Sequence, residues 1–152
     1  MKLKTMRNRL SVAALVIGIA FLTGCASVPM ASKEQDAVSK TFPQPASDKA
    51  GLYVFRNNFM GKALKKAVSI DGVLIGRTAN KTYFYKSITP GKHTLSTESE
   101  FGDNSVAFQA EGGKNYYARQ YIKMGVFVGG AGIEMVSEDE GKREVLECEL
   151  AQ

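Results

Sequence analysis

The residue types best suited to thiol, imidazole or zinc chemistry occur three times in the 152-residue sequence, as Cys25, Cys148 and the single histidine, His93. His93 could serve as the general base of a hydrolase, but the sequence holds no G-x-S-x-G motif that would supply a nucleophilic serine. A zinc site usually needs several Cys or His ligands, so the sequence predicts no metal site and no cofactor. We therefore expect a protein that is not an enzyme, with a hydrolase that uses His93 as the alternative.

Cys25 follows a segment that is organised like a signal peptide. Residues 1–9 carry four basic side chains, and residues 10–22 form a thirteen-residue run without charge. A helix of this length spans about 20 Å, short of the ~30 Å hydrocarbon core of a bilayer, which favours a signal peptide over a transmembrane span. Small residues lead up to Gly24, as a signal peptidase requires. The segment predicts a signal peptide of residues 1–24, with cleavage between Gly24 and Cys25.

The L-T-G-C order of residues 22–25 resembles the lipobox of bacterial lipoproteins. The resemblance implies a diacylglyceryl group on the Cys25 thiol and a further acyl chain, such as palmitate, on its new amino group. Two or three long acyl chains anchor a protein stably to a membrane. In Gram-negative lipoproteins an Asp after the lipidated Cys favours the inner membrane. Here Ala26 and Ser27 follow, which implies the periplasmic leaflet of the outer membrane, with the inner membrane as the alternative. The pattern also leaves open an unlipidated secretory signal and a core helix with a buried cysteine.

The net charge of +5 comes mostly from the segment that cleavage would remove. Residues 1–24 hold four of the 20 basic side chains and no acidic one, so the rest of the chain carries 16 basic and 15 acidic residues. A nucleic-acid-binding surface needs clustered basic charge in the mature protein. We therefore expect no nucleic acid partner.

Cys148 would be the one free thiol once Cys25 carries lipid. In an oxidising compartment it then has no partner for an intramolecular disulfide. A lone buried cysteine behaves as a small apolar side chain, so we predict that Cys148 packs in the core. An intermolecular disulfide and a reactive thiol are the alternatives.

Residues 25–49 are predicted to form the lipidated N-terminus and a flexible tether. The segment 26–49 holds three of the four prolines and few large apolar side chains. Its 24 residues would reach about 27 Å as a random coil, enough to hold a domain of residues 50–152 away from the membrane. Phe42 is predicted to dock on the edge of that domain.

From residue 50 onward, short β-rich runs alternate with turn residues. The runs lie at residues 52–56, 67–70, 73–75, 82–88, 93–98, 105–110, 116–122 and 133–136. This spacing predicts an all-β fold, a mainly antiparallel β-sandwich that is transthyretin- or immunoglobulin-like. Ser137 and the acidic residues after it predict a short C-terminal helix at 138–145 that runs into an extended end.

Two turns have distinctive chemistry. Asp71-Gly72 predicts a type I′ hairpin turn, because both residues tolerate positive φ. The T-P-G-K run at 89–92 predicts a type II turn between its flanking strands. We expect Gly72→Val to destabilise the protein far more than Gly112→Ala, because Gly112 lies in a longer reversal that can redistribute strain.

The uncharged, glycine-broken segment at 124–130 has two interpretations. The pattern favours a buried crossover between two sheets. The alternative is a loop that contacts a protein partner or a membrane. The residues that would make this contact are Met124, Val126, Phe127 and Val128.

Four motifs in order carry a family resemblance: L-Y-V-F-R at 52–56, S-I-D-G at 69–72, T-P-G-K-H at 89–93 and G-K-N-Y-Y-A at 113–118. Over roughly residues 42–149 the chain resembles the bacterial lipoproteins called domain of unknown function 2846. The resemblance implies a β-sandwich with a Y-V-F-R first strand and a P-G-K-H hairpin, and it implies no catalytic residue. We expect a membrane-anchored periplasmic lipoprotein whose non-catalytic domain binds or scaffolds an envelope protein. The alternative is an outer-membrane-anchoring subunit of a secretion or envelope machine.

Overall fold

The computed structural model describes residues 27–99, 104–125 and 129–152. The predictions about the signal peptide, Gly24 and Cys25 lie outside the described residues, as do those about Val126, Phe127 and Val128. None of the helices in the described part of the chain has the length and apolar composition of a membrane span.

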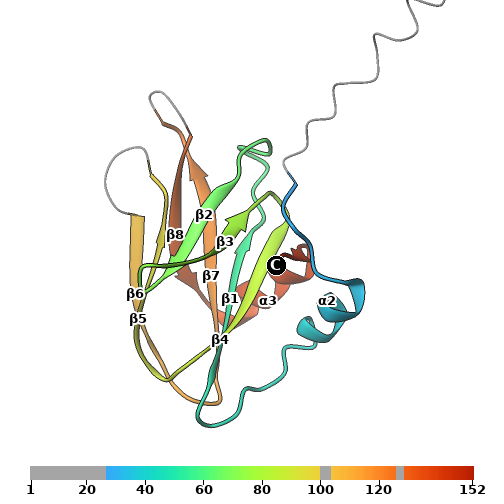
Figure 1. Ribbon diagram of the computed structural model, residues 1–152, viewed down its shortest axis with the longest axis vertical. Coiled ribbons are helices and arrows are strands. Elements are labelled where there is room, and N and C mark those ends of the chain that lie inside the picture. Colours follow the sequence, from blue (N-terminus) through green and yellow to red (C-terminus); the bar gives the residue numbers. More distant parts are fainter. Residues whose placement is uncertain (1–26, 100–103, 126–128) are drawn as a thin grey trace, which may run out of the picture.

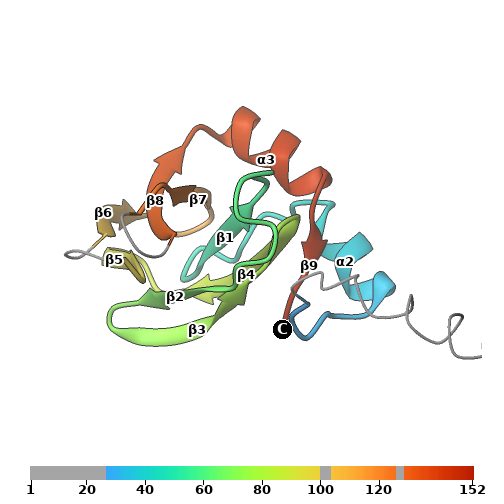
Figure 2. The same cartoon turned by 90° about the horizontal axis from the view of Figure 1, so that it is seen from above.

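Two β-sheets form the body of the molecule (Figures 1 and 2). The five-stranded sheet has the order β8-β7-β1-β4-β9, and the four-stranded sheet has the order β3-β2-β5-β6. The strands are β1 (Ala50–Arg56), β2 (Lys66–Ile70), β3 (Val73–Thr78), β4 (Thr82–Ile88), β5 (Gly91–Thr97), β6 (Asn104–Ala110), β7 (Asn115–Lys123), β8 (Gly130–Val136) and β9 (Glu149–Leu150). Neighbouring strands are antiparallel except for the parallel pairs β1–β7 and β4–β9. The predicted mainly antiparallel, two-sheet fold is confirmed.

Both faces of the central strand β1 are buried. Leu52 and Val54 point between the sheets, where they join the apolar side chains of β2, β5, β7 and β8. Tyr53 and Phe55 point to the outer face of the five-stranded sheet, because successive side chains of a strand alternate between its faces. Two helices, α2 (Lys33–Ser39) and α3 (Glu138–Leu146), lie against this outer face (Figure 2).

The C-terminal helix and extended end are confirmed as α3 and β9. Helix α3 begins after Ser137, whose hydroxyl accepts a hydrogen bond from the backbone N–H of Glu140 at 3.3 Å. Cys148 follows the helix and is buried in the outer core with Tyr53 and Tyr117. This confirms core packing for its side chain, and burial raises the pKa of the Cys148 thiol to about 12.

The prediction of a flexible tether at 26–49 is wrong for the described residues 27–49. Helix α2 begins at a capping box, in which the side chains of Ser32 and Gln35 each accept a hydrogen bond from the other residue's backbone N–H. The Asp36 carboxylate accepts the backbone N–H of Leu150 at 3.0 Å, which holds α2 to the C-terminal strand. Phe42 docks as predicted, with its ring centroid 5.4 Å from that of Tyr53. Hydrogen bonds of α2 and the aromatic contact of Phe42 thus hold this segment against the rest of the domain.

The two turn predictions have different outcomes. Asp71 and Gly72 have φ values of 51° and 80°, which confirms the type I′ hairpin between β2 and β3. The predicted P-G-K-H hairpin at residues 90–93 is wrong, because β4 and β5 belong to different sheets. Gly91 is already the first residue of β5 and pairs with Ala110. Residues 89–90 therefore carry the chain from one sheet to the other.

Four connections leave the sandwich at the same end. The registers show that β1, β3, β5 and β7 finish there, while β2, β4, β6 and β8 begin there. We call this the loop end; it lies at the top of Figure 1. The opposite end carries the β2–β3 hairpin and the β4–β5 and β6–β7 connections.

Candidate functional site

The described chain begins at the loop end, where residues 27–31 form a strap against the C-terminal residues. Val28 is buried beside Ala79, Phe84 and Ala151. Two backbone hydrogen bonds join the strap to the C-terminal residues. The N–H of Gln152 donates to the carbonyl of Pro29, and the N–H of Ala31 donates to the carbonyl of Leu150, each at 2.9 Å. The strap therefore fixes where the chain enters the domain.

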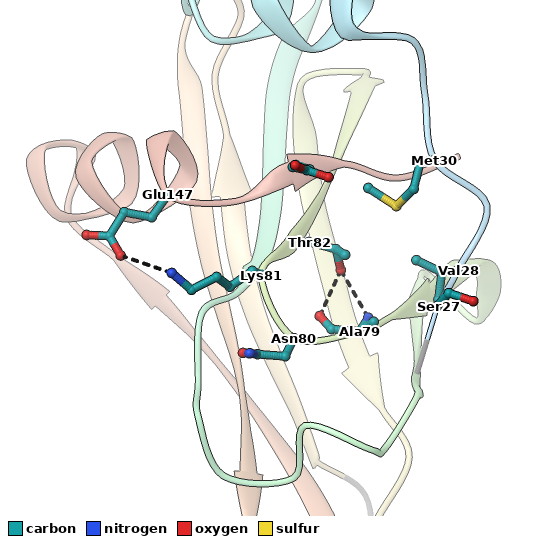
Figure 3. A pocket seen from close by; sticks show the side chains of 9 residues that line it. Ser27, Val28, Met30, Ala79, Asn80, Lys81, Thr82 and Glu147 are labelled. Atoms are coloured by element: carbon teal, nitrogen blue, oxygen red, sulfur yellow. Dashed lines mark hydrogen bonds and ion pairs between the residues drawn. The ribbon is translucent and has the colours of Figure 1, made fainter. Parts of the chain in front are cut away.

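A cavity of about 370 Å³ opens beside the strap (Figure 3). Its lining comes from the strap, the turn between β3 and β4, and the residues around β9: Ser27, Val28, Met30, Ala79, Asn80, Lys81, Thr82, Glu147 and Glu149. The Thr82 hydroxyl closes the turn, since it accepts the N–H of Ala79 and donates to its carbonyl oxygen. Lys81 lies 4.0 Å from the Glu147 carboxylate. These contacts lie within the turn and between the turn and the residue that follows α3, and none of them forms a nucleophile–base pair.

Two loops at the loop end expose large apolar side chains. Residues 57–65 join β1 to β2, and residues 124–129 join β7 to β8. Phe59 is 80% exposed, Met60 49% and Met124 85%. The loops are neighbours, because a Cβ on Gly61 would lie 2.8 Å from Ile122, and one on Gly129 would lie 2.7 Å from Leu64.

The buried crossover predicted at 124–130 is wrong. Strands β7 and β8 are antiparallel neighbours in one sheet, and Lys123 pairs with Gly130 across the connection. The chain therefore stays in the same sheet between these two strands and does not cross to the other. Met124, the member of the predicted contact set that the structure describes, points to solvent.

Lysines accompany these apolar residues. Lys62, Lys65, Lys66 and Lys123 lie in or beside the two loops, and residues 57–66 and 123–129 contain no acidic residue. The Lys62 ammonium lies 3.7 Å from the centroid of the Phe59 ring, a cation–π contact. We define the loop-end surface as Phe59, Met60, Lys62, Lys65, Lys123 and Met124. It combines exposed apolar side chains with positive charge.

A buried arginine supports the larger of the two loops. Arg56 ends β1 and is fully buried, and its Nη2 donates to the carbonyl of Leu64 at 2.6 Å. Burial lowers the pKa of the guanidinium group. This role was not predicted from the sequence, although a charged residue that ends an apolar strand was a signal for it. Arg56 holds the loop backbone in place while Phe59 stays exposed.

A buried amide joins the two sheets below the loop end. Gln120 of β7 is fully buried and donates to Thr97 Oγ1 at 2.6 Å and to the carbonyl of Ala67 at 3.3 Å. Its side-chain oxygen accepts a hydrogen bond from the Thr78 hydroxyl. Buried polar groups that are satisfied in this way rigidify the structure around them.

His93 lies at the opposite end of the sandwich, with both ring nitrogens in use. Its Nδ1 lies 2.6 Å from a carboxylate oxygen of Asp71, and its Nε2 lies 2.8 Å from the carbonyl oxygen of Thr89. Both partners are acceptors, so the ring satisfies them fully when both nitrogens carry protons. The hydrogen bond to Asp71 is the main cause that raises the pKa of His93. Both ring nitrogens are thus engaged in contacts that hold the β2–β3 hairpin and the connection between β4 and β5.

Within the described ranges, no group of three or more His, Cys, Asp or Glu side chains is arranged to hold a metal ion.

The aromatic strand residues also have a structural role. Tyr53, Tyr83 and Tyr117 pack together in the outer core, with the Tyr53 and Tyr117 rings stacked at 5.1 Å.

Fold and contacts together define a small β-sandwich protein whose outer sheet face is covered by two helices and whose histidine and buried cysteine have structural roles. The chain belongs to the DUF2846 family, described as a protein of unknown function, whose model matches residues 46–131. An uncharacterized protein of Haemophilus influenzae is similar to the chain, with 49% identity over 139 residues that cover 91% of this chain and 83% of the relative. The family match spans both loops of the loop-end surface.

Proposed function

We propose that the protein is a lipid-anchored protein of the bacterial envelope, with a non-catalytic domain that binds or scaffolds a partner there. Cys25 would carry the lipid, and the periplasmic leaflet of the outer membrane would hold it. The signal-peptide pattern and the L-T-G-C motif support the anchor. The burial of Cys148 and the two hydrogen bonds of His93 support a role without catalysis.

The observation that carries the proposal furthest is the position of the strap. Ser27 lies two residues after Cys25, and the buried Val28 follows directly. Two extended residues span at most about 7 Å. An acyl group on Cys25 would therefore hold the domain against the bilayer, whereas a long tether would let it move away. This favours a domain that works at the membrane surface.

Metabolic labelling with a fatty acid tests the anchor. Wild-type protein should take up label and fractionate with membranes, while Cys25→Ser should take up none, since only the thiol forms the thioether to lipid. Cys148→Ala is the matched control, because it removes the other cysteine and should label like wild type. Label on Cys25→Ser, or none on wild type, would contradict the proposal.

The choice of membrane has its own test. Ala26→Asp places an acidic residue directly after the lipidated cysteine, the arrangement that favours retention in the inner membrane. Density-gradient fractions should show wild type in the outer membrane and Ala26→Asp in the inner membrane. Wild type in the inner membrane would contradict the proposed location but leave the anchor intact.

A further inference from the structure

The strap determines which end of the sandwich would face the bilayer. Ser27 lies at the loop end, where it lines one side of the cavity and Asn80 and Lys81 line the other (Figure 3). With Cys25 at most about 7 Å away, an acyl group there would bring the loop end to the membrane surface. The hairpin turn at Asp71-Gly72 would lie at the opposite end of the sandwich.

The loop-end surface has the composition that suits contact with lipid headgroups. Aromatic and sulfur-containing side chains fit the boundary between headgroups and acyl chains, and lysines attract anionic lipids there. We propose that the loop-end surface rests on an anionic phospholipid bilayer. Phe59, Met60 and Met124 enter the interface, and Lys62, Lys65 and Lys123 meet the lipid phosphates. This inference rests on the proposed lipid anchor at Cys25.

The acidic residues described near this surface do not neutralise its lysines. Glu98 lies 3.6 Å from Arg77 and accepts the backbone N–H of Ala67. Glu147 lies next to Lys81 and accepts a hydrogen bond from Asn57. Among the described residues, no ion pair joins Lys62 or Lys65 to a carboxylate. Their charge is therefore free to attract an anionic surface.

The surface is also held in place from below. Arg56 fixes the loop that carries Phe59, and Gln120 joins the two sheets beneath it. Exposed apolar side chains on an ordered loop lose little further conformational freedom when they bind. The arrangement is therefore suited to binding at the interface.

Single labels with a polarity-sensitive dye can test the inference on the acylated full chain. Cys25 is blocked by lipid and Cys148 is buried, so a cysteine introduced on the surface is the thiol that reacts. Labels go on Phe59→Cys and Met124→Cys, and on Val73→Cys as the matched control, since Val73 is 68% exposed at the opposite end. Reaction of one thiol per chain shows that each variant is folded, because an unfolded chain would also expose Cys148.

The labelled proteins are floated with vesicles of phosphatidylethanolamine and phosphatidylglycerol, and with vesicles of phosphatidylcholine. Dyes at 59 and 124 should shift to the blue with the anionic vesicles and shift less with phosphatidylcholine, while the dye at 73 should not shift. Replacing Lys62 and Lys65 with Gln should reduce the shift at 124.

The outcomes separate the two proposals. A protein that co-floats but shows the same emission at positions 59, 124 and 73 overturns the inference and leaves the anchor standing. Equal shifts with both vesicle types overturn the role of anionic headgroups. A protein that does not co-float overturns the proposed anchor, and the inference with it.

Discussion

Asp71 and His93 form a polar cluster that holds the β2–β3 hairpin to β5. The Asp71 carboxylate lies against the His93 ring, and it also accepts the backbone N–H of Thr94 at 2.8 Å. The hydrogen bond to His93 is the main cause that lowers the pKa of Asp71, and the same bond raises the pKa of His93. The sequence presented His93 as a candidate catalytic base, and in the structure its two ring nitrogens contact Asp71 and the carbonyl oxygen of Thr89.

The stability of the protein should depend on pH through this pair. Because the pKa of His93 is raised in the folded protein, its contribution to the free energy of unfolding is fully present below pH 6.5, the ordinary pKa of histidine. The contribution is lost as the pH rises through the raised pKa. Because the pKa of Asp71 is lowered in the folded protein, its contribution is fully present above pH 3.8, the ordinary pKa of aspartate. The contribution is lost as the pH falls through the lowered pKa. The pair therefore stabilises the fold most between pH 3.8 and pH 6.5.

Asp71→Asn should remove this contribution while keeping a residue that accepts positive φ. Urea unfolding at about pH 5.5 and about pH 9 gives the difference in unfolding free energy between wild type and variant, which should shrink at the higher pH. Glu111→Gln is the control, because it breaks a surface ion pair with Lys114 at the same end, and its effect should not change over this range. If Asp71→Asn changes the free energy of unfolding by the same amount at both pH values, the ion pair between Asp71 and His93 is contradicted.

At the scale of elements, α3 packs on β7 through a glycine. Gly141 is buried, and a Cβ at this position would lie 2.5 Å from Cδ1 of Tyr117 and closer still to its Cβ and Cγ. Gly→Ala inside a helix usually stabilises it by about 0.5–1 kcal/mol. Overpacking a buried site costs about 1–3 kcal/mol. The close approach of helix and strand therefore outweighs the helix propensity.

We predict that Gly141→Ala lowers the free energy of unfolding by about 1–2 kcal/mol in a urea titration. Arg143→Ala, at an exposed position of the same helix, should stay within about 0.5 kcal/mol of wild type. A Gly141→Ala variant that is more stable than wild type would show that α3 can move away from Tyr117.

The turn between β6 and β7 packs more tightly than its sequence suggested. A Cβ on Gly112 would overlap the carbonyl oxygen of Ser47 and lie 2.8 Å from its carbonyl carbon. This part of the chain is held there, since Gly113 donates to the carbonyl of Lys49 at 2.8 Å. Gly72, by contrast, has φ +80°, and a Cβ added there would meet nothing within 4 Å. The expectation that Gly112 lies in a forgiving reversal is therefore wrong.

Gly112→Ala should destabilise the protein at least as much as Gly72→Val. A backbone clash costs about 1–3 kcal/mol, and positive φ at a β-branched residue costs about 1–2 kcal/mol. Thermal unfolding of the two variants compares them directly. If Gly112→Ala melts like wild type while Gly72→Val is destabilised, the contact with Ser47 does not limit the turn.

Local patterns predicted most of the elements. Alternating apolar residues indicated the strands, Asp71-Gly72 indicated the hairpin, and Ser137 with its acidic neighbours indicated α3. Helix α2 was missed although Ser32 and Gln35 form a capping box, because the prolines and sparse apolar residues around them indicated a tether. Turn residues report where the chain reverses, but they do not report whether the next strand joins the same sheet. The connections at 89–90 and 111–114 both change sheets, which the turn residues alone did not indicate.

At the scale of the whole molecule, the arrangement of the loops could not be predicted from the sequence. The lysines at 62, 65 and 123 and the apolar residues near them were visible, but they come from two loops about 60 residues apart in the chain. The parallel pairing of β1 with β7 brings these loops together, and strand pairing of that kind depends on the tertiary fold. The strap then brings the N-terminal side of the chain into the domain at the same end.

The orientation of the domain on the membrane is tested most directly by energy transfer to headgroup-labelled lipids. A donor at residue 124 and a donor at residue 73 lie at opposite ends of strands of about seven residues, which separates them by about 23 Å along the sandwich. In vesicles that hold the acylated protein, transfer from residue 124 should be much stronger than from residue 73. Equal transfer from the two positions, or stronger transfer from residue 73, would contradict a domain held by its strap with the loop end on the bilayer.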